Sequence, residues 1–321
     1  MTSIALIQAA AARLAGHARL TPLLNAPLLD RIAGRRVFVK AECLQWTGSF
    51  KFRGGWSAVS ALPAGTKGVI AYSSGNHAQG VALAASRHGL PCVILMPADA
   101  PAVKIANTRA YGAEVVLYDR ATEDRDAIGA ALAQARGLAL VKPFDDVQVI
   151  AGQGTVGLEI AAQAAEAGIG PATVLTCCGG GGLTAGIALA LKAHAPQMIV
   201  RPCEPAGFDD TARSLASGRR ERNATTAGSI CDAIVTPSPG EITFPILRRL
   251  CGPGLVVGDD EACRAVALAF QHLRIVLEPG GAVALAAALF RDDLPDTVIC
   301  TASGGNVDAA LFADILTRFP E

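Results

Sequence analysis

The stretch TVLTCCGGGGLTAGIALALKAHA, residues 173–195, decides the fold. It begins as an apolar strand, turns through four consecutive glycines and continues into a helix of alanine and leucine. A strand that is apolar along its whole length belongs to a sheet that is covered on both faces. The stretch therefore predicts a parallel sheet with helices packed on either side of it.

The same alternation runs through the rest of the chain. An apolar strand followed by glycine or a turn recurs at residues 198–205 and 296–305, and Ala/Leu-rich helices separate these strands. Fully apolar strands that alternate with helices indicate the α/β class. Upstream we expect strands at residues 35–42, 67–74, 91–97, 113–119 and 138–143, and helices at residues 77–89, 103–112 and 125–136.

Composition excludes several classes of protein. The chain has 321 residues, 51% of them hydrophobic, which suffices for one large or two moderate domains. Lys plus Arg and Asp plus Glu both number 28, and a formal charge of zero argues against a nucleic-acid partner. We find neither a signal-peptide pattern nor an apolar run approaching the ~18 residues of a membrane span. The nine scattered cysteines form no C-x-x-C pair, which predicts reduced thiols and a cytoplasmic protein.

Three strand ends carry glycine-containing loops, at residues 73–80, 178–186 and 301–308. Ligands of such sheets bind beyond the carboxyl ends of the strands. In the second loop, four glycines expose backbone N–H groups at the start of a helix, which suits an anion. The loop lacks both a convincing dinucleotide fingerprint and a Walker A sequence, so we expect a single phosphate monoester. A tight packing turn is the alternative interpretation.

A lysine in an unusual setting suggests the rest of the ligand. Lys51 lies between Phe50 and Phe52 in TGSFKFRGG, with glycines on both sides. A lysine that is desolvated among aromatic residues loses its charge more readily, and a neutral amine is a nucleophile. A planar aromatic aldehyde with one phosphate is pyridoxal 5′-phosphate, which Lys51 would hold as a Schiff base. An amphipathic surface lysine is the alternative.

Four motifs, SFKFRG, SSGNHAQG, CGGGGL and SGGNVD, follow one another in this order. In them the chain resembles the serine racemase and serine/threonine dehydratase group of pyridoxal-phosphate enzymes, over about residues 21–308. The resemblance implies the tryptophan-synthase-β type fold: two open, mainly parallel twisted sheets with helices on both faces, and the cofactor in the cleft between two domains. It implies a large cofactor-binding domain of residues 1–65 and 147–321 and a small substrate-loop domain of residues 66–146.

The resemblance also assigns roles in cofactor binding. Lys51 matches the Schiff-base lysine, Phe50 lies against the ring, and Asn76 bonds the ring hydroxyl. Ser303 faces the pyridine nitrogen, and a hydroxyl there cannot hold a proton on that nitrogen firmly, which favours elimination over transamination. The remaining implied contacts are the backbone of Gly179, Gly180, Gly181, Gly182 and Leu183 around the phosphate, and Gly240 beside the ring.

For the substrate, the resemblance implies that a loop grips the α-carboxylate of an amino acid. It also implies that Ser74 acts as acid or base on the face opposite Lys51. For His77, a purely structural hydrogen bond at the start of a helix is the alternative. The implied carboxylate loop comprises Ser73, Ser74, Asn76 and His77.

The implied activity is that of a carbon–oxygen lyase, an ammonia-lyase that converts a β-hydroxy amino acid to a 2-keto acid and ammonia. L-Threonine and L-serine are the expected substrates. The alternatives are 3-hydroxyaspartate dehydration, serine or aspartate racemisation with side dehydration, and dehydration of a hydroxylated diamino acid. A non-catalytic nucleotide-binding α/β protein is the alternative from outside this class.

The racemase branch of the resemblance adds a metal site and an assembly. Glu204, Asp210 and the backbone carbonyl of Phe208 match oxygen ligands for Mg²⁺, or for Ca²⁺ or Mn²⁺. A solvated acidic turn is the alternative. A homodimer is the expected assembly.

Three departures from the pattern concern the substrate. Gly228 stands where the threonine-rich segment of the family often has Asp, and Lys142 stands where the family often has His. By rough register, an arginine that could meet a second carboxylate falls on Ala131. This loss argues against a dicarboxylic substrate, although Lys142 could itself pair with a distal carboxylate.

Overall fold

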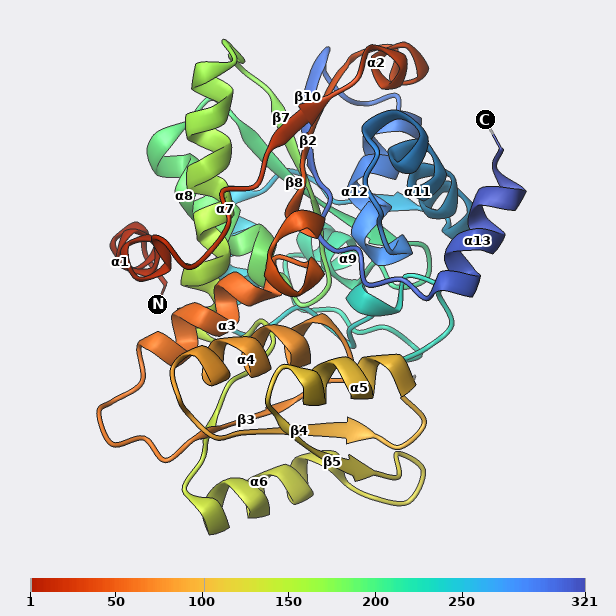
Figure 1. The fold of residues 1–321 in the computed structure, drawn as a ribbon. Helices are drawn as coiled ribbons and strands as arrows, with labels where there is room; N and C mark the ends of the chain where they lie inside the picture. Colours follow the sequence, from red (N-terminus) through yellow and green to blue (C-terminus); the bar gives the residue numbers. More distant parts are fainter. Residues whose placement is uncertain (1, 101, 321) are drawn as a thin grey trace.

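The computed structural model describes residues 2–100 and 102–320, and they form two separate sheets (Figure 1). In the larger sheet the strand order is β1-β2-β10-β7-β8-β9. Its neighbouring strands are parallel except for β1 and β2, which are antiparallel. The strands are β1 (Leu23–Asn25), β2 (Arg36–Lys40), β7 (Thr173–Cys177), β8 (Ile199–Pro205), β9 (Leu255–Val257) and β10 (Thr297–Thr301).

The smaller sheet is entirely parallel, with the strand order β5-β4-β3-β6. Two mainly parallel sheets in one chain confirm the predicted fold class. Each of these four strands lies within a segment expected to be a strand. The strands are β3 (Val69–Tyr72), β4 (Cys92–Pro97), β5 (Glu114–Tyr118) and β6 (Ala139–Leu140).

Helices cover both faces of the larger sheet (Figure 1). One face packs against α7 (Val147–Glu166) and α8 (Gly182–His194). The other packs against α2 (Pro27–Ala33), α11 (Asp259–Leu273) and α12 (Pro279–Phe290). Residues Pro279–Leu289 of α12 are all buried, because this helix carries no polar side chain.

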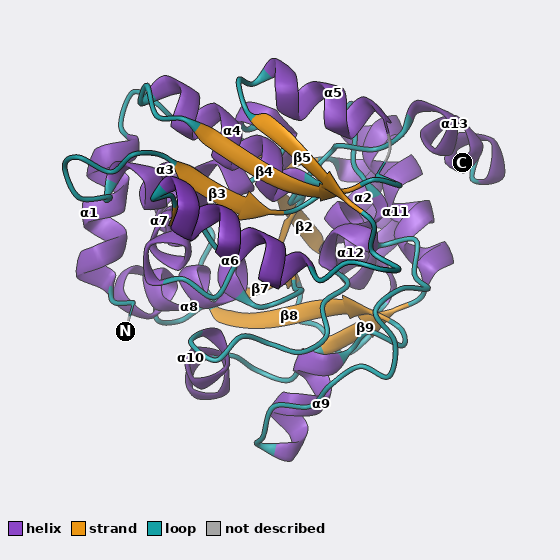
Figure 2. Cartoon of the chain, turned by 90° about the horizontal axis from the view of Figure 1, so that it is seen from below, coloured by secondary structure: helices purple, strands orange, loops and turns teal. Residues whose placement is uncertain are grey.

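The smaller sheet is covered in the same way. Helices α4 (Asn76–Arg87) and α5 (Ala102–Ala110) lie on the face toward the larger sheet, and α6 (Arg125–Arg136) covers the opposite face (Figures 1 and 2). The remaining helices are α1 (Ile4–Leu14), α3 (Lys51–Ser60), α9 (Asp210–Ser217), α10 (Thr243–Leu250) and α13 (Ala309–Arg318).

Helix α3 lies between the two sheets and packs against both α4 and α7 (Figure 1). Local sequence does not predict this helix, because two adjacent glycines, Gly54 and Gly55, lower its intrinsic stability. The glycines allow close contact with two neighbouring helices: a Cβ on Gly55 would lie 3.0 Å from the Gly80 backbone of α4, and one on Gly54 would lie 2.9 Å from the Val149 side chain of α7. A Cβ on Gly80 of α4 would lie 2.9 Å from the carbonyl carbon of Lys51, so only glycine allows the two helices to approach this closely.

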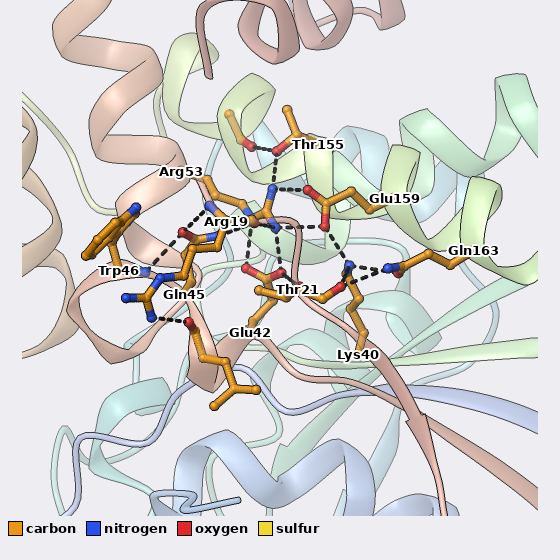
Figure 3. Close-up of polar contacts among 12 residues, drawn as sticks. Arg19, Thr21, Lys40, Glu42, Gln45, Trp46, Arg53, Thr155, Glu159 and Gln163 are labelled. Atoms are coloured by element: carbon orange, nitrogen blue, oxygen red, sulfur yellow. Dashed lines mark hydrogen bonds and ion pairs between the residues drawn. The ribbon is translucent and has the colours of Figure 1, made fainter. Parts of the chain in front are cut away.

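A buried cluster of charges fixes α3 to the larger sheet (Figure 3). The Arg53 guanidinium donates to both carboxylate oxygens of Glu42, at 2.8 Å each. It also donates to both oxygens of Glu159 on α7, at 2.6 and 2.9 Å. Although burial alone would raise it, the pKa of Glu42 is lowered by the charge and hydrogen bonds of Arg53. The arginine is thus held by two carboxylates, as a buried charge requires.

Lys40 completes the cluster from the end of β2. Its Nζ donates to Glu159 Oε2 at 2.5 Å, to Gln163 Oε1 at 2.9 Å and to the Thr21 carbonyl at 2.7 Å. The two cations, Lys40 and Arg53, therefore balance the two carboxylates of the cluster. The cluster joins β2, the turn that follows it, α3 and α7.

No helix within residues 2–100 and 102–320 is long and apolar enough to cross a membrane.

Replacing Arg53 with Met is expected to lower the free energy of unfolding by about 3–5 kcal/mol, because the buried Glu42 would lose its cationic partner and Glu159 would keep only Lys40. Urea unfolding followed by circular dichroism measures this. The control is Arg125→Met, which breaks an exposed pair with Asp126 and should change stability by less than about 1 kcal/mol. An Arg53→Met protein as stable as the wild type would contradict the assigned role of the cluster.

Candidate functional site

Two adjoining cavities lie where the glycine loops meet. The first, called the glycine-loop cavity, contains residues 179–183, Phe50 and Ser303 in its wall. The second, called the serine-loop cavity, contains residues 72–77 and Lys104. Loops from both sheets therefore meet at Lys51. The residues that line both cavities are Lys51, Asn76, Phe144, Ala233, Thr236 and Glu278.

The glycine loop links β7 to α8 and leaves no room for side chains. A Cβ on Gly180 would lie 2.2 Å from the Phe144 ring, and one on Gly179 would lie 2.8 Å from the Ile234 carbonyl oxygen. Gly181 has φ of 88°, a left-handed conformation that favours glycine, and it precedes α8 without a capping side chain. The first N–H groups of α8 are consequently free to bind an anion.

Lys51 is the first residue of α3 and lines both cavities. Its Nζ donates to the Pro143 carbonyl at 2.8 Å and lies 5.2 Å from the centre of the Phe50 ring. Burial lowers the pKa of Lys51 to about 8, and the Glu278 carboxylate opposes this only in part. A considerable fraction of the amine is therefore neutral near pH 8 and can react with a carbonyl group.

The serine loop follows β3 and leads into α4. Ser73 Oγ accepts a hydrogen bond from the Gly75 N–H at 3.3 Å, while Ser74 lines the cavity. Gly75 precedes α4 without a capping side chain, so the N-terminal N–H groups of this helix also lack a side-chain partner. A helix N-terminus attracts a carboxylate through its free N–H groups and its dipole.

His77 lies in the same wall, but its ring is engaged elsewhere. Its Nε2 is 2.9 Å from the Val141 carbonyl oxygen, which can only accept a hydrogen bond. Burial and the charge of Lys51 lower the pKa of His77 to about 3, so the ring is neutral and its Nδ1 carries no proton. The ring therefore offers neither a cation nor a donor to a carboxylate, so His77 could serve the carboxylate loop only through its backbone N–H in the first turn of α4.

Asn76 binds Glu278, a carboxylate in the site that sequence reasoning had not indicated. Its Nδ2 donates to Glu278 Oε1 at 2.6 Å, and its Oδ1 accepts from Asn306 at 2.6 Å. Burial raises the pKa of Glu278 to about 7, although the hydrogen bond from Asn76 opposes the shift. A sequence signal existed, since Glu278 is an acidic residue placed directly before the wholly apolar α12.

Other expected residues lie as follows. Ser303 is buried, lines the glycine-loop cavity, and accepts a backbone hydrogen bond from Phe50 at 3.1 Å. Gly240 is not among the residues that line either cavity; its N–H donates to the Gly180 carbonyl at 3.1 Å, which supports the glycine loop from behind. The wall contains Ala233 instead.

The structure also places the three positions at which the sequence departs from the pattern of the resembled family. Lys142 and Ala131 are exposed and are not among the residues that line either cavity. Gly228 packs near Phe208. Besides Glu278, the wall of the serine-loop cavity contains the acidic residue Asp232, four residues after Gly228, and sequence reasoning did not single it out.

The charges inside the cavities do not act independently. Glu278 accepts from Asn76, partly offsets the lowered pKa of Lys51, and is itself affected by Lys104 and Asp232.

The expected metal ligands lie behind the glycine loop. Glu204 accepts from the backbone N–H groups of Thr211 and Ala212 at 2.9 and 2.7 Å. Burial and the nearby Asp210 raise the pKa of Glu204 well above its usual value, and burial raises that of Asp210 to about 6. Asp210 Oδ2 is buried without a partner among the described residues. Within residues 2–100 and 102–320, no three His, Cys, Asp or Glu side chains gather as a metal site.

The reactivity of Lys51 with a small amine-directed arylating reagent is expected to rise with pH, with a midpoint near 8, because only the neutral amine reacts. Mass spectrometry of the labelled peptide, taken from ligand-free protein over a pH series, measures this. In urea-unfolded protein the midpoint should move to about 10.4, the value of an unperturbed lysine. The same midpoint in folded and unfolded protein would show that burial does not control this amine.

The glycine-loop cavity fits a phosphorylated planar ring. The Gln153 amide and the Thr236 hydroxyl are buried in its wall and have no hydrogen-bond partner among the described residues, so both are available to a ligand. The free N–H groups of α8 suit a phosphate, and the Lys51 amine suits an aldehyde carbon.

Comparisons with known proteins agree with this geometry. An L-threo-3-hydroxyaspartate ammonia-lyase from Pseudomonas sp is 42% identical over 315 residues, which are 96% of either chain. The structure of a threonine deaminase from T.th. is 47% identical with a TM-score of 0.91, and the match covers 95% of this chain and 99% of that one. Maize serine racemase is 34% identical with a TM-score of 0.91, covering 99% and 97%.

A family model described as pyridoxal-phosphate dependent enzyme matches residues 14–306. That span contains the glycine loop, Lys51 and the serine loop, which together form the two cavities. The chain belongs to the family of pyridoxal-phosphate dependent enzymes.

Proposed function

We propose that the protein is an ammonia-lyase that eliminates the β-hydroxyl group of a small amino acid and releases a 2-keto acid and ammonia. The observation that carries the proposal is the Lys51 amine, which lies with lowered pKa between the glycine loop and the serine loop. The named ammonia-lyase relative and the threonine deaminase structure support this reaction type.

In this proposal the glycine-loop cavity holds pyridoxal 5′-phosphate. The backbone of Gly179, Gly180, Gly181, Gly182 and Leu183 binds the phosphate, Lys51 binds the aldehyde carbon, and Phe50 lies against the ring. Asn76 and Ser303 complete the polar contacts, and Gly240 acts indirectly by supporting the loop. When bound, the cofactor stabilises negative charge on the substrate Cα.

The chain itself positions the substrate and moves its proton. The N-terminus of α4, with Ser73 and Ser74, binds the α-carboxylate. Lys51, once free, takes the Cα proton, and its lowered pKa allows it to be neutral before that step. Ser74 is proposed as the acid or base on the opposite side, which a racemase side activity would require.

We propose L-threonine and L-serine as substrates, because neither Ala131 nor the exposed Lys142 offers a second-carboxylate site in the cavities. A second candidate is 3-hydroxyaspartate. It is favoured by the 42% identity to an L-threo-3-hydroxyaspartate ammonia-lyase and by Lys104, a cation in the wall of the serine-loop cavity.

We further propose that residues 66–146, which contain the smaller sheet, form a small domain against residues 1–65 and 147–321. A homodimer is proposed on symmetry grounds. A divalent cation is proposed at Glu204, Asp210 and the Phe208 carbonyl, supported by the buried, unpaired Oδ2 of Asp210.

Lys51→Ala is expected to reduce keto acid release from L-threonine and L-serine by at least about 100-fold, because the general base is lost. A coupled keto acid assay of the cofactor-loaded protein measures this. Circular dichroism serves as the control for folding. A folded Lys51→Ala protein that turns over at the wild-type rate would falsify the proposed function.

Removal of divalent cations by a chelator is expected to lower the thermal unfolding temperature, because a cation that binds only the folded protein stabilises it and that stabilisation is lost on removal. Mg²⁺ should restore it. Glu204→Gln, which removes one charge, should make the protein insensitive to both treatments. An unfolding temperature that responds to neither chelator nor Mg²⁺ in the wild type argues against the cation.

A further inference from the structure

Lys104 is a cation at the serine-loop cavity that takes no part in the proposed proton transfer or in binding of the α-carboxylate. It lies in the first turn of α5, and its Nζ is 3.4 Å from Asp232 Oδ2. Its side chain is 21% exposed, whereas that of Asp232 is 69% exposed. Among the described residues that line this cavity, Lys104 and Lys51 are the only lysines or arginines.

The ion pair of Lys104 is poorly suited to a purely structural role. A separation of 3.4 Å is long for an ion pair, and a partner as exposed as Asp232 is well solvated, so the pair contributes little to stability. Lys104 and Asp232 also come from the two different parts of the chain that carry the smaller and larger sheets. The pair can therefore exchange partners at low cost when a stronger anion enters.

The position of Lys104 suits the distal end of a substrate. If the α-carboxylate binds at the N-terminus of α4, a second carboxylate on Cβ must find another partner within the cavity, because an unpaired buried carboxylate is costly. The exposed Lys142 is not in the wall, and Glu278 and Asp232 are acidic. That leaves Lys104 as the cation available to it.

We propose that Lys104 binds the second carboxylate of a dicarboxylic β-hydroxy amino acid such as 3-hydroxyaspartate, and so determines specificity between dicarboxylic and monocarboxylic substrates. The inference rests on the proposed function. Asp232 is the internal competitor: it neutralises Lys104 when a substrate such as L-threonine has no second carboxylate, and it gives way when the substrate has one.

The neighbouring carboxylate supports this arrangement. Lys104, Asp232 and Glu278 all line the serine-loop cavity, and they also line a third cavity on the side of Asn107 and Asn306. Lys104 stabilises the charged form of Glu278, and Asp232 destabilises it. Lys104 shares the wall of the serine-loop cavity with Ser74 and Asn76, so it is a cation that the second carboxylate of a substrate in this cavity can meet.

The test compares Lys104→Gln with the matched control Lys142→Gln, both as cofactor-loaded protein. For L-threo-3-hydroxyaspartate, Lys104→Gln should lower kcat/KM by about 10- to 100-fold, the value of one charge-assisted hydrogen bond. For L-threonine the change should stay within about threefold, since no carboxylate meets Lys104. Lys142→Gln should leave both substrates unaffected, because its side chain is exposed outside the cavities.

Asp232→Asn gives an independent test in the opposite direction. Removal of the competitor and of its negative charge should raise the preference for the dicarboxylic substrate over L-threonine. An equal loss on both substrates in Lys104→Gln, or no loss on either, would overturn the specificity role. A preference unchanged in Asp232→Asn would overturn the competitor role of Asp232.

A binding measurement separates this inference from the proposed function. L-Aspartate and L-alanine lack a β-hydroxyl group, so neither can undergo the elimination, and the absorbance of the bound cofactor reports their binding. Lys104→Gln should weaken L-aspartate binding alone. If the wild-type protein releases keto acid from none of the substrates, the proposed function is contradicted. The binding titration still decides the role of Lys104 in that case. Equal binding of L-aspartate by wild type and Lys104→Gln overturns it.

Discussion

The binding of the Arg53 guanidinium by two carboxylates is the interaction on which the rest of the site depends. Helix α3 begins with Lys51, and Arg53 follows two residues later with its guanidinium held by Glu42 and Glu159. A buried arginine that is saturated with carboxylate bonds has few alternative positions. The cluster also includes Lys40 on β2, and Glu159 belongs to α7, so the start of α3 is tied to the larger sheet. The Lys51 amine is thereby held beside the glycine loop.

The second constraint is the close approach of α4 to α3. Gly80 touches the backbone of Lys51, so the start of α4 and the serine loop before it are held near the amine. Helix α3 is thus held on one side by the ion pairs of Arg53 and on another by close backbone contact with Gly80 of α4. The two parts of the chain that carry the sheets meet at this helix, and the cavities open between their glycine loops.

Local sequence was enough for those features that depend on neighbouring residues. The apolar strands, the helix at Arg125–Arg136 and the four-glycine turn were predictable because strand patterning, helix propensity and glycine conformation are short-range properties. The unusual setting of Lys51 between two phenylalanines and flanking glycines was also visible in the chain. The resemblance of four motifs to one enzyme group then implied which ligand these features serve.

Only the tertiary structure decided which distant side chains complete the site. Glu278, Asp232 and Lys104 lie far from Lys51 in sequence and line the same cavity as Lys51, because strands and helices from both sheets end there. Lys142, a candidate from the sequence, turns outward, and Gly240 supports the loop rather than lining the cavity. Sequence patterns report the burial and periodicity of a segment. The direction of a charged side chain is instead set by packing between segments, so it was decided by the tertiary structure alone.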